Sequence, residues 1–218
     1  QRMKLFICAI LFFSAAFAAG TTPHVPVWPN EFSATVLIND WREPFPQFVR
    51  WFWSAAQNTD RLDGLVFFAG EWAFAETIFD HNARVQYVVA YQGDSIVCNA
   101  FPINKTLPKP NFKNYEFEGR AINNGEDADI WGFDDRVNNR YVRYWDSRRN
   151  YTHPLRFDFI EGDRRGTRAL TFEYKEFDAG PQDRDLFQIP KYIKDSCNYR
   201  SAAVKAAAYG GEPLSALN

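Results

Sequence analysis

Short segments rich in aromatic and β-branched residues recur along most of this chain, with turn signals between them. The 218-residue sequence contains 21 Phe, 10 Tyr and 7 Trp, and such residues fit pleated, half-buried surfaces. Within Asn139–Trp145 the pattern has the period of two that a strand requires. Tyr141 and Arg143 fall on one face, and Val142 and Tyr144 on the other. The pattern predicts an all-β domain.

The strand-like segments follow one another at regular spacing. The expected strands are 32–38, 48–54, 65–69, 73–79, 84–91, 95–98, 115–122, 139–145, 155–160 and 169–177. Segment 48–54 is apolar enough to be buried on both faces, and Arg61–Gly64 has the composition of a turn. A strongly twisted antiparallel sheet or pair of sheets closes into a barrel or half-barrel, or stacks, to hide its edges. Such folds often enclose a cavity for one small ligand.

The beginning of the sequence predicts export. Lys4 precedes the apolar run Leu5–Phe13, and Ala16-Phe17-Ala18 has the small-x-small pattern of a cleavage site. We therefore expect a signal peptide over residues 1–19, a single β domain over 20–197 and a flexible tail over 198–218. The alternative is an uncleaved anchor or a buried core segment. No later segment reaches the roughly 20 apolar residues that span a bilayer, so we expect a secreted, extracellular protein without a membrane span.

The cysteines and glycosylation sequons agree with a secreted protein. Cys8 leaves with the signal peptide, and Cys98 and Cys197 remain. Two cysteines in an oxidising compartment most often pair; two free or intermolecular thiols are the alternative. Asn-x-Thr sequons begin at Asn104 and Asn150, each in a segment typical of surface loops. We expect a disulfide-bonded glycoprotein.

The residues offer little catalytic chemistry. His24, His81 and His153 have no His or Cys at ligand spacing, so we expect no zinc site and interpret each as a surface or turn residue. No Gly-x-Ser-x-Gly motif or Gly-rich phosphate loop occurs. Glu71 and Glu76 lie among aromatic residues and leave a carbohydrate-active module as one alternative. The prediction is a protein without enzymatic activity or a cofactor.

Charge narrows the range of partners. The 25 Lys and Arg nearly balance the 27 Asp and Glu, which excludes a basic nucleic-acid surface. Asn123–Asp129, with Asp134 and Asp135, is rich in the oxygen ligands that calcium prefers, but it lacks the EF-hand spacing. We interpret it as a solvated loop, with weak calcium binding as the alternative and no other metal site.

The order of landmarks resembles the ependymin-related secreted proteins. Its strongest part is the ending, in which Phe177 and Gly180 precede Leu186-Phe187-x-x-Pro190 and a final Cys197. Earlier landmarks are Pro29, Phe32, Ala34, Arg84, Val88, Tyr91, Cys98, Phe117, Gly119, Ala121, Trp131, Arg140–Trp145, Pro154-Leu155-Arg156, Phe172 and Tyr174. The resemblance implies two antiparallel sheets wrapped as an open barrel around a deep hydrophobic pocket, as in periplasmic lipoprotein carriers. It also implies secreted glycoproteins that are often dimeric, some of which bind calcium. This chain differs in having a single cysteine pair after the signal peptide.

The leading hypothesis is a secreted, non-enzymatic protein that binds or carries a lipid or fatty acid in this pocket, with a homodimer as an additional partner. The aromatic residues proposed to line the pocket are Trp51, Trp53, Phe67, Phe79, Tyr87, Tyr91, Trp131, Tyr144 and Phe172; ordinary core packing is the alternative for each. A structural or adhesive extracellular glycoprotein is the second hypothesis. It predicts a solid core and an exposed apolar patch large enough for a partner.

Overall fold

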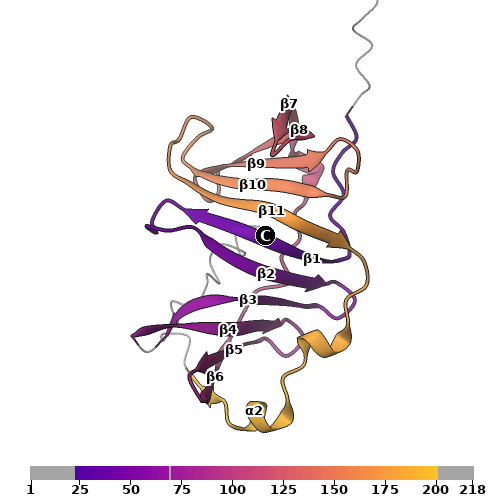
Figure 1. The fold of residues 1–218 in the computed structure, drawn as a ribbon. Coiled ribbons are helices and arrows are strands. Elements are labelled where there is room, and N and C mark those ends of the chain that lie inside the picture. The colour runs from indigo at the N-terminus through magenta and orange to yellow at the C-terminus, as the bar shows by residue number, and fades with distance from the viewer. Residues whose placement is uncertain (1–22, 69, 201–218) are drawn as a thin grey trace, which may run out of the picture.

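The strands of this protein form one open sheet. The computed structural model describes residues 23–68 and 70–200, so the predicted signal peptide and residues 201–218 of the predicted tail lie outside it. Twelve strands hydrogen-bond in the order β12-β6-β5-β4-β3-β2-β1-β11-β10-β9-β8-β7 (Figure 1). The all-β, open architecture is confirmed. The two expected sheets are two halves of one sheet, joined where β1 pairs with β11.

All neighbouring strands are antiparallel except the short β12, which runs parallel to β6. The strands are β1 (Glu31–Asp40), β2 (Gln47–Ser54), β3 (Thr59–Phe68), β4 (Glu71–Asp80), β5 (Val85–Gln92), β6 (Ser95–Pro102), β7 (Glu116–Asn123), β8 (Glu126–Asp135), β9 (Arg140–Ser147), β10 (Pro154–Glu161), β11 (Ala169–Ala179) and β12 (Asn198–Tyr199). Within the described residues, no helix has the length and apolar character needed to cross a bilayer.

Two segments that the sequence predicted to be irregular are strands. Arg61–Gly64 belongs to β3, because Leu62 is buried while Arg61 and Asp63 pair with each other on the opposite face. The acidic stretch after Asn123 forms β8, and a tight turn at Asn124 and Gly125 joins it to β7. Both turn residues have positive φ, at 50° and 83°, as a two-residue hairpin requires.

The main core lies on one side of the sheet, here called the inner face. A row of directly paired residues crosses it from β11 to β8: Phe172, Phe157, Tyr144 and Trp131. Trp51 and its neighbours on β1–β4 continue the same buried cluster. β2 therefore buries alternate residues on one face. The apolar sequence of 48–54 had suggested burial on both faces, and that prediction is wrong.

Two irregular segments cover the inner face. Trp28, which precedes β1, packs edge-on against Phe32 and Trp53 with ring centroids 5.5 and 6.4 Å apart. The loop after β6 buries Phe112 in the same cluster. The indole N–H of Trp53 donates to the Pro108 carbonyl at 3.2 Å and fixes this loop in place. These segments occupy the side on which a ligand pocket was expected.

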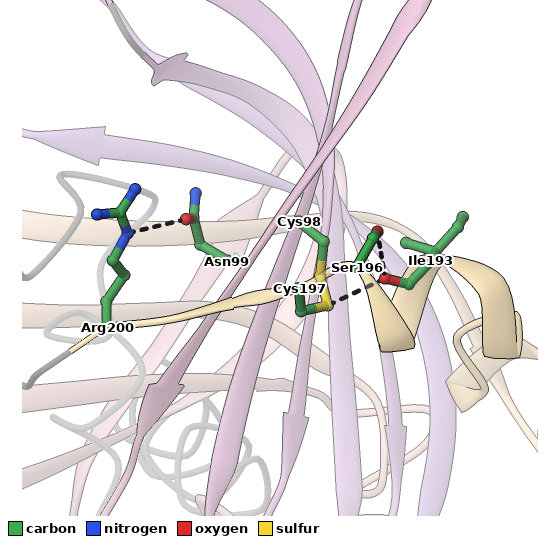
Figure 2. Close-up of a disulfide and its surroundings, with 6 residues drawn as sticks. All are labelled: Cys98, Asn99, Ile193, Ser196, Cys197 and Arg200. Atoms are coloured by element: carbon green, nitrogen blue, oxygen red, sulfur yellow. Dashed lines mark hydrogen bonds between the residues drawn. A yellow bond between two sulfur atoms is a disulfide. The ribbon is translucent and has the colours of Figure 1, made fainter.

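The opposite, outer face is covered in part by the chain after β11. This cover consists of a 3₁₀ turn η2 (Arg184–Phe187) and helix α2 (Lys191–Asp195), after which β12 extends the edge of the sheet beside β6. Ile193 packs on Tyr87 and Cys98, and the Cys98–Cys197 disulfide joins this segment to β6 (Figure 2). The predicted pairing of these cysteines is present. Strand β12 lies past Cys197, within the segment predicted to be a flexible tail.

Candidate functional site

The residues predicted to line a pocket do not face one space. Most lie on the inner face, where they form the main core: Trp51, Trp53, Phe79, Trp131, Tyr144 and Phe172. The other three lie on the outer face, because cross-strand pairing places them among residues such as Phe74, Ile78 and Ile96. Of these, Tyr87 is buried beneath α2, Tyr91 is half-buried, and Phe67 is exposed. Because successive side chains of a strand point to opposite faces, the predicted pocket residues, which were chosen by residue type, are divided between the two faces of the sheet.

Three of the inner residues border no empty space. A side chain that borders empty space keeps surface that a water molecule can touch, but Trp51, Trp53 and Tyr144 have exposed fractions of 0%. A depression of about 520 Å³ does exist beside β7–β9. Its lining is polar and charged: Asn114, Glu116, Gly132, Phe133, Asp134, Tyr141, Asp163, Arg164 and Arg165. It therefore lacks the apolar surface that the predicted lipid pocket requires.

Large apolar side chains are instead exposed on the outer face of β2–β6. Phe48, Leu65 and Trp72 have exposed fractions of 62%, 54% and 60%. Single exposed apolar residues are ordinary, but a contiguous group marks an interaction site. We call this group the outer patch; its members are Phe48, Leu65, Phe67, Trp72, Phe74 and Ile96.

Strand register makes the outer patch contiguous. Leu65 of β3 pairs with Phe74 of β4, and Phe67 pairs with Trp72. The rings of Phe67 and Trp72 meet edge to face with centroids 5.7 Å apart. Phe74 then pairs with Tyr91 of β5, whose ring centroid lies 6.2 Å away. Cross-strand aromatic contacts of this kind hold the rings in a fixed arrangement.

The outer patch begins where the C-terminal cover ends. Arg61 donates to the Leu186 carbonyl of η2 at 2.8 Å and also pairs with Asp63 and Glu76 at 2.7 and 3.1 Å. Burial and the neighbouring Glu76 raise the pKa of Tyr91 to about 12, so its hydroxyl keeps its proton. This hydrogen-bonded polar network borders the exposed aromatic rings, and together they form an amphipathic surface.

More exposed apolar residues lie in turns at the same end of the sheet. Antiparallel pairing puts the β1–β2, β3–β4 and β10–β11 turns at one end, on the left of Figure 1. Trp41 and Phe45 are exposed in the first of these turns, and Phe45 has an exposed fraction of 76%. Val137 is exposed in the β8–β9 turn, at that end too. We call the outer patch together with Trp41 and Phe45 the aromatic end.

Both sequons lie at the opposite end of the sheet. Asn104 follows the end of β6, and Asn150 lies in the turn between β9 and β10. Both residues are exposed. Asn150 accepts hydrogen bonds from the backbone N–H and the hydroxyl of Thr152 at 3.1 and 2.6 Å. Glycans at these positions would leave the aromatic end uncovered.

His81 shows a buried polar site that the sequence did not reveal. It lies in a turn, as predicted, but its side chain is buried, with Nε2 2.8 Å from Asp60 and Nδ1 2.9 Å from the Lys105 carbonyl. Trp51 donates to the other Asp60 oxygen at 3.3 Å. Burial raises the pKa of Asp60. For His81, burial is the largest single effect and lowers the pKa, but the hydrogen bonds to Asp60 and Lys105 and the nearby carboxylate charges together shift it upward. The hydrogen bonds of His81 to Asp60 and Lys105 fix the loop that carries Asn104.

The other candidate sites from the sequence separate in the structure. Glu71 and Glu76 are five positions apart on β4 and project to opposite faces, so they do not flank one substrate bond. The acidic stretch is a hairpin in which Asp129 accepts from Arg120 at 3.1 Å. Over residues 23–68 and 70–200, no three His, Cys, Asp or Glu side chains gather as they would around a metal ion.

Comparisons with known proteins support the fold alone. No protein-family model and no curated protein matches this chain. Among solved structures, it is similar to an uncharacterized conserved protein from Thermus thermophilus, with a TM-score of 0.51 and 16% identity over 79% of this chain and 91% of that one. None of these comparisons names an ependymin-related protein, so that assignment stays a prediction.

Two further solved structures show a weaker likeness. PNGF-II matches at a TM-score of 0.34 and 9% identity; the aligned part covers 79% of this chain but 31% of the PNGF-II chain. A DUF1329 family protein from Desulfovibrio piger matches at a TM-score of 0.28 and 9% identity, over 73% of this chain and 90% of that one. Likeness at these TM-scores does not identify a shared activity.

Proposed function

We propose that this protein is a secreted, non-enzymatic binder of hydrophobic or amphipathic molecules, such as fatty acids and other lipids, and that it binds them at the outer patch. The observation that carries the proposal is the contiguous set of exposed aromatic and aliphatic side chains on β2–β6. Among the described residues, the rings of the outer patch contact one another and Tyr91, and their large exposed fractions leave apolar surface open to a ligand.

The chemistry of the outer patch suits a molecule with one apolar and one polar part. An alkyl chain that covers the rings of Phe67, Trp72 and Phe74 removes apolar surface from water, at about 25 cal/mol per Å². The adjacent network of Arg61 and Glu76 offers hydrogen-bonding groups to a polar head. The predicted signal peptide and the resemblance to ependymin-related proteins support an extracellular site of action.

Titration with a fluorescent fatty acid tests this proposal. Wild-type protein should bind the probe, and the triple substitution Phe67→Ser, Trp72→Ser, Phe74→Ser should reduce affinity at least about tenfold, because three apolar contacts are lost. Tyr151→Ser is the matched control, since Tyr151 is an exposed aromatic residue in the β9–β10 turn, at the opposite end of the sheet from the outer patch. Equal binding by the wild type and the triple variant, with equal thermal stability, would exclude the outer patch.

An interior carrier is the second candidate function. The hydroxyls of Tyr144 and Tyr174 and the indole N–H of Trp28 are buried without a hydrogen-bond partner among the described residues. Buried polar groups normally have a partner. A ligand head that displaced the Trp28 segment would supply one. In that case Trp28→Ala would change fatty-acid affinity and the triple substitution on the outer face would not.

A further inference from the structure

The aromatic end extends beyond the outer patch, and its shape indicates a partner larger than a single small molecule. Resting on the proposed function, we propose that this end of the sheet docks onto the interface of a neutral phospholipid bilayer. The outer patch would contact lipid with one side, and the turn between β1 and β2 would enter the interface first.

The position of the exposed rings supports an end-on approach. Phe45 and Trp41 lie in the β1–β2 turn, and Phe48 follows them at the start of β2. Leu65 and Trp72 lie close to the neighbouring β3–β4 turn, at the same end. Trp and Phe are the side chains that settle at the boundary between lipid headgroups and acyl chains. Rings carried on turns project beyond the end of the sheet, so they can reach a flat surface that the side of the sheet could not contact alone.

The charges at the aromatic end favour a neutral surface. Two of its turn arginines are paired with carboxylates of the same end: Arg42 with Asp40 at 2.6 Å, and Arg136 with Asp134 at 3.0 Å. Arg164 and Arg165, exposed in the β10–β11 turn at this end, directly follow the carboxylate of Asp163 in the chain. Arg168 lies 3.6 Å from Glu161 and stacks over the Trp41 ring at 4.8 Å. Carboxylates that neutralise the arginines also repel anionic headgroups. Zwitterionic lipid is therefore the matching surface, and apolar contact supplies the affinity.

The predicted glycans agree with this orientation. Asn104 and Asn150 are exposed at the far end of the strands, so bulky sugars there would point away from a bilayer that contacts the aromatic end. The buried His81–Lys105 contact holds the Asn104 loop at that distance. One end of the molecule is thus suited to water and the other to lipid.

Cosedimentation with phosphatidylcholine vesicles tests the docking. We expect wild-type binding to persist at about 1 M salt, where the Debye length is about 3 Å, and to be no tighter when phosphatidylserine is added. Phe45→Ser should weaken vesicle binding about tenfold and leave fluorescent fatty-acid binding unchanged, since Phe45 lies outside the outer patch. Trp72→Ser should weaken both, and Tyr151→Ser neither.

The outcomes separate the two proposals. If the wild type binds the fatty acid but not vesicles, or if Phe45→Ser binds vesicles normally, bilayer docking is overturned and the proposed function stands. Vesicle binding that is lost in high salt or needs phosphatidylserine also overturns docking to a neutral surface. If neither fatty acid nor vesicles bind, both proposals fail. Quenching of tryptophan fluorescence by brominated phosphatidylcholine in the wild type, reduced by Trp72→Ser, would support contact by the aromatic end.

Discussion

Asp146 is the residue whose surroundings most affect the pH dependence of stability. The exposed fraction of Asp146 is 2%, and the strand register places it directly opposite a second carboxylate, Asp129 of β8. Trp131 donates its indole N–H to Asp146 at 2.8 Å. Burial, and then the charge of Asp129, raise the pKa of Asp146 from 3.8 to about 7. The folded protein thus binds this proton more tightly than the unfolded chain does.

A pH-dependent loss of stability follows from that shift. Because the folded-state pKa is raised, the free energy of unfolding should fall as the pH rises from about 4 to about 7. Asp146→Asn keeps an oxygen for Trp131 and removes the charge. We predict that it raises the free energy of unfolding at pH 8 by up to about 4 kcal/mol and changes little at pH 4. Urea unfolding at both pH values measures this, with the exposed Asp134→Asn as control. An unchanged pH slope in Asp146→Asn would contradict it.

His81 marks the limit of single-residue prediction from sequence. A lone histidine between Asp80 and Asn82 has the composition of a solvated turn, and the turn is correct. Its burial depends on Asp60 and Lys105, which lie 21 and 24 positions away. No local pattern connects these positions. The same holds for Asp146 and Asp129, whose proximity depends on the register between two strands.

At the scale of elements, the segment after β11 depends on its disulfide. The hydroxyl of Ser196 donates to the Ile193 carbonyl at 2.8 Å, and Arg200 donates to Asn99 at 3.3 Å (Figure 2). Helix α2 has only five residues, too few to be stable alone. The cross-link to β6 therefore keeps this cover on the outer face.

Removing the disulfide should destabilise the whole domain. Cys98 and Cys197 are 99 positions apart, and closing a loop of that length contributes about 4–5 kcal/mol in the chain-entropy model. We predict a loss of that size in urea unfolding of the Cys98→Ala, Cys197→Ala variant. Reductant should lower the stability of the wild type similarly and leave the variant unchanged. A loss below about 1 kcal/mol would show that the cover docks without its cross-link.

Most strands were predictable because alternation is a local property. Two segments predicted to be irregular are strands. Arg61–Gly64 has turn-forming residues, but Arg61 and Asp63 pair on the outer face while Leu62 is buried on the inner face. In β8, acidic residues obscured a strand whose apolar members, Ala128 and Trp131, are buried. In both segments, tertiary pairing outweighed composition.

At the scale of the whole molecule, the sequence shows that aromatic residues are abundant but not which of them lie on the inner face of the sheet and which on the outer face. Phe67 and Trp51 look alike in sequence, yet one is exposed on the outer face and the other is fully buried. The difference depends on strand parity and on which half of the sheet the C-terminal segment covers. Neither is visible without the fold. The candidate site therefore moved from a predicted interior to a surface.

A glycan placed at the aromatic end provides a test at this scale. Gly93 lies in the β5–β6 turn with φ of 55°, a conformation that asparagine also adopts. Gly93→Asn puts an asparagine two positions before Ser95, in the Asn-x-Ser arrangement that secreting eukaryotic cells glycosylate. The sugar would stand close to Ile96 of the outer patch, whereas native sugars at Asn104 and Asn150 would stand at the far end.

We predict that Gly93→Asn protein from such cells loses fatty-acid and vesicle binding, because a hydrated glycan prevents apolar contact. The same variant produced in bacteria, without the glycan, should bind like the wild type, which separates shielding from a folding defect. Glycosylated wild type should also bind normally, since its sugars lie away from the aromatic end. Mass spectrometry establishes occupancy at each asparagine before binding is measured. Undiminished binding by fully glycosylated Gly93→Asn protein would mean that ligands approach another face. Loss of binding when Asn104 and Asn150 are glycosylated would mean that ligands bind at the end of the sheet that carries these two residues.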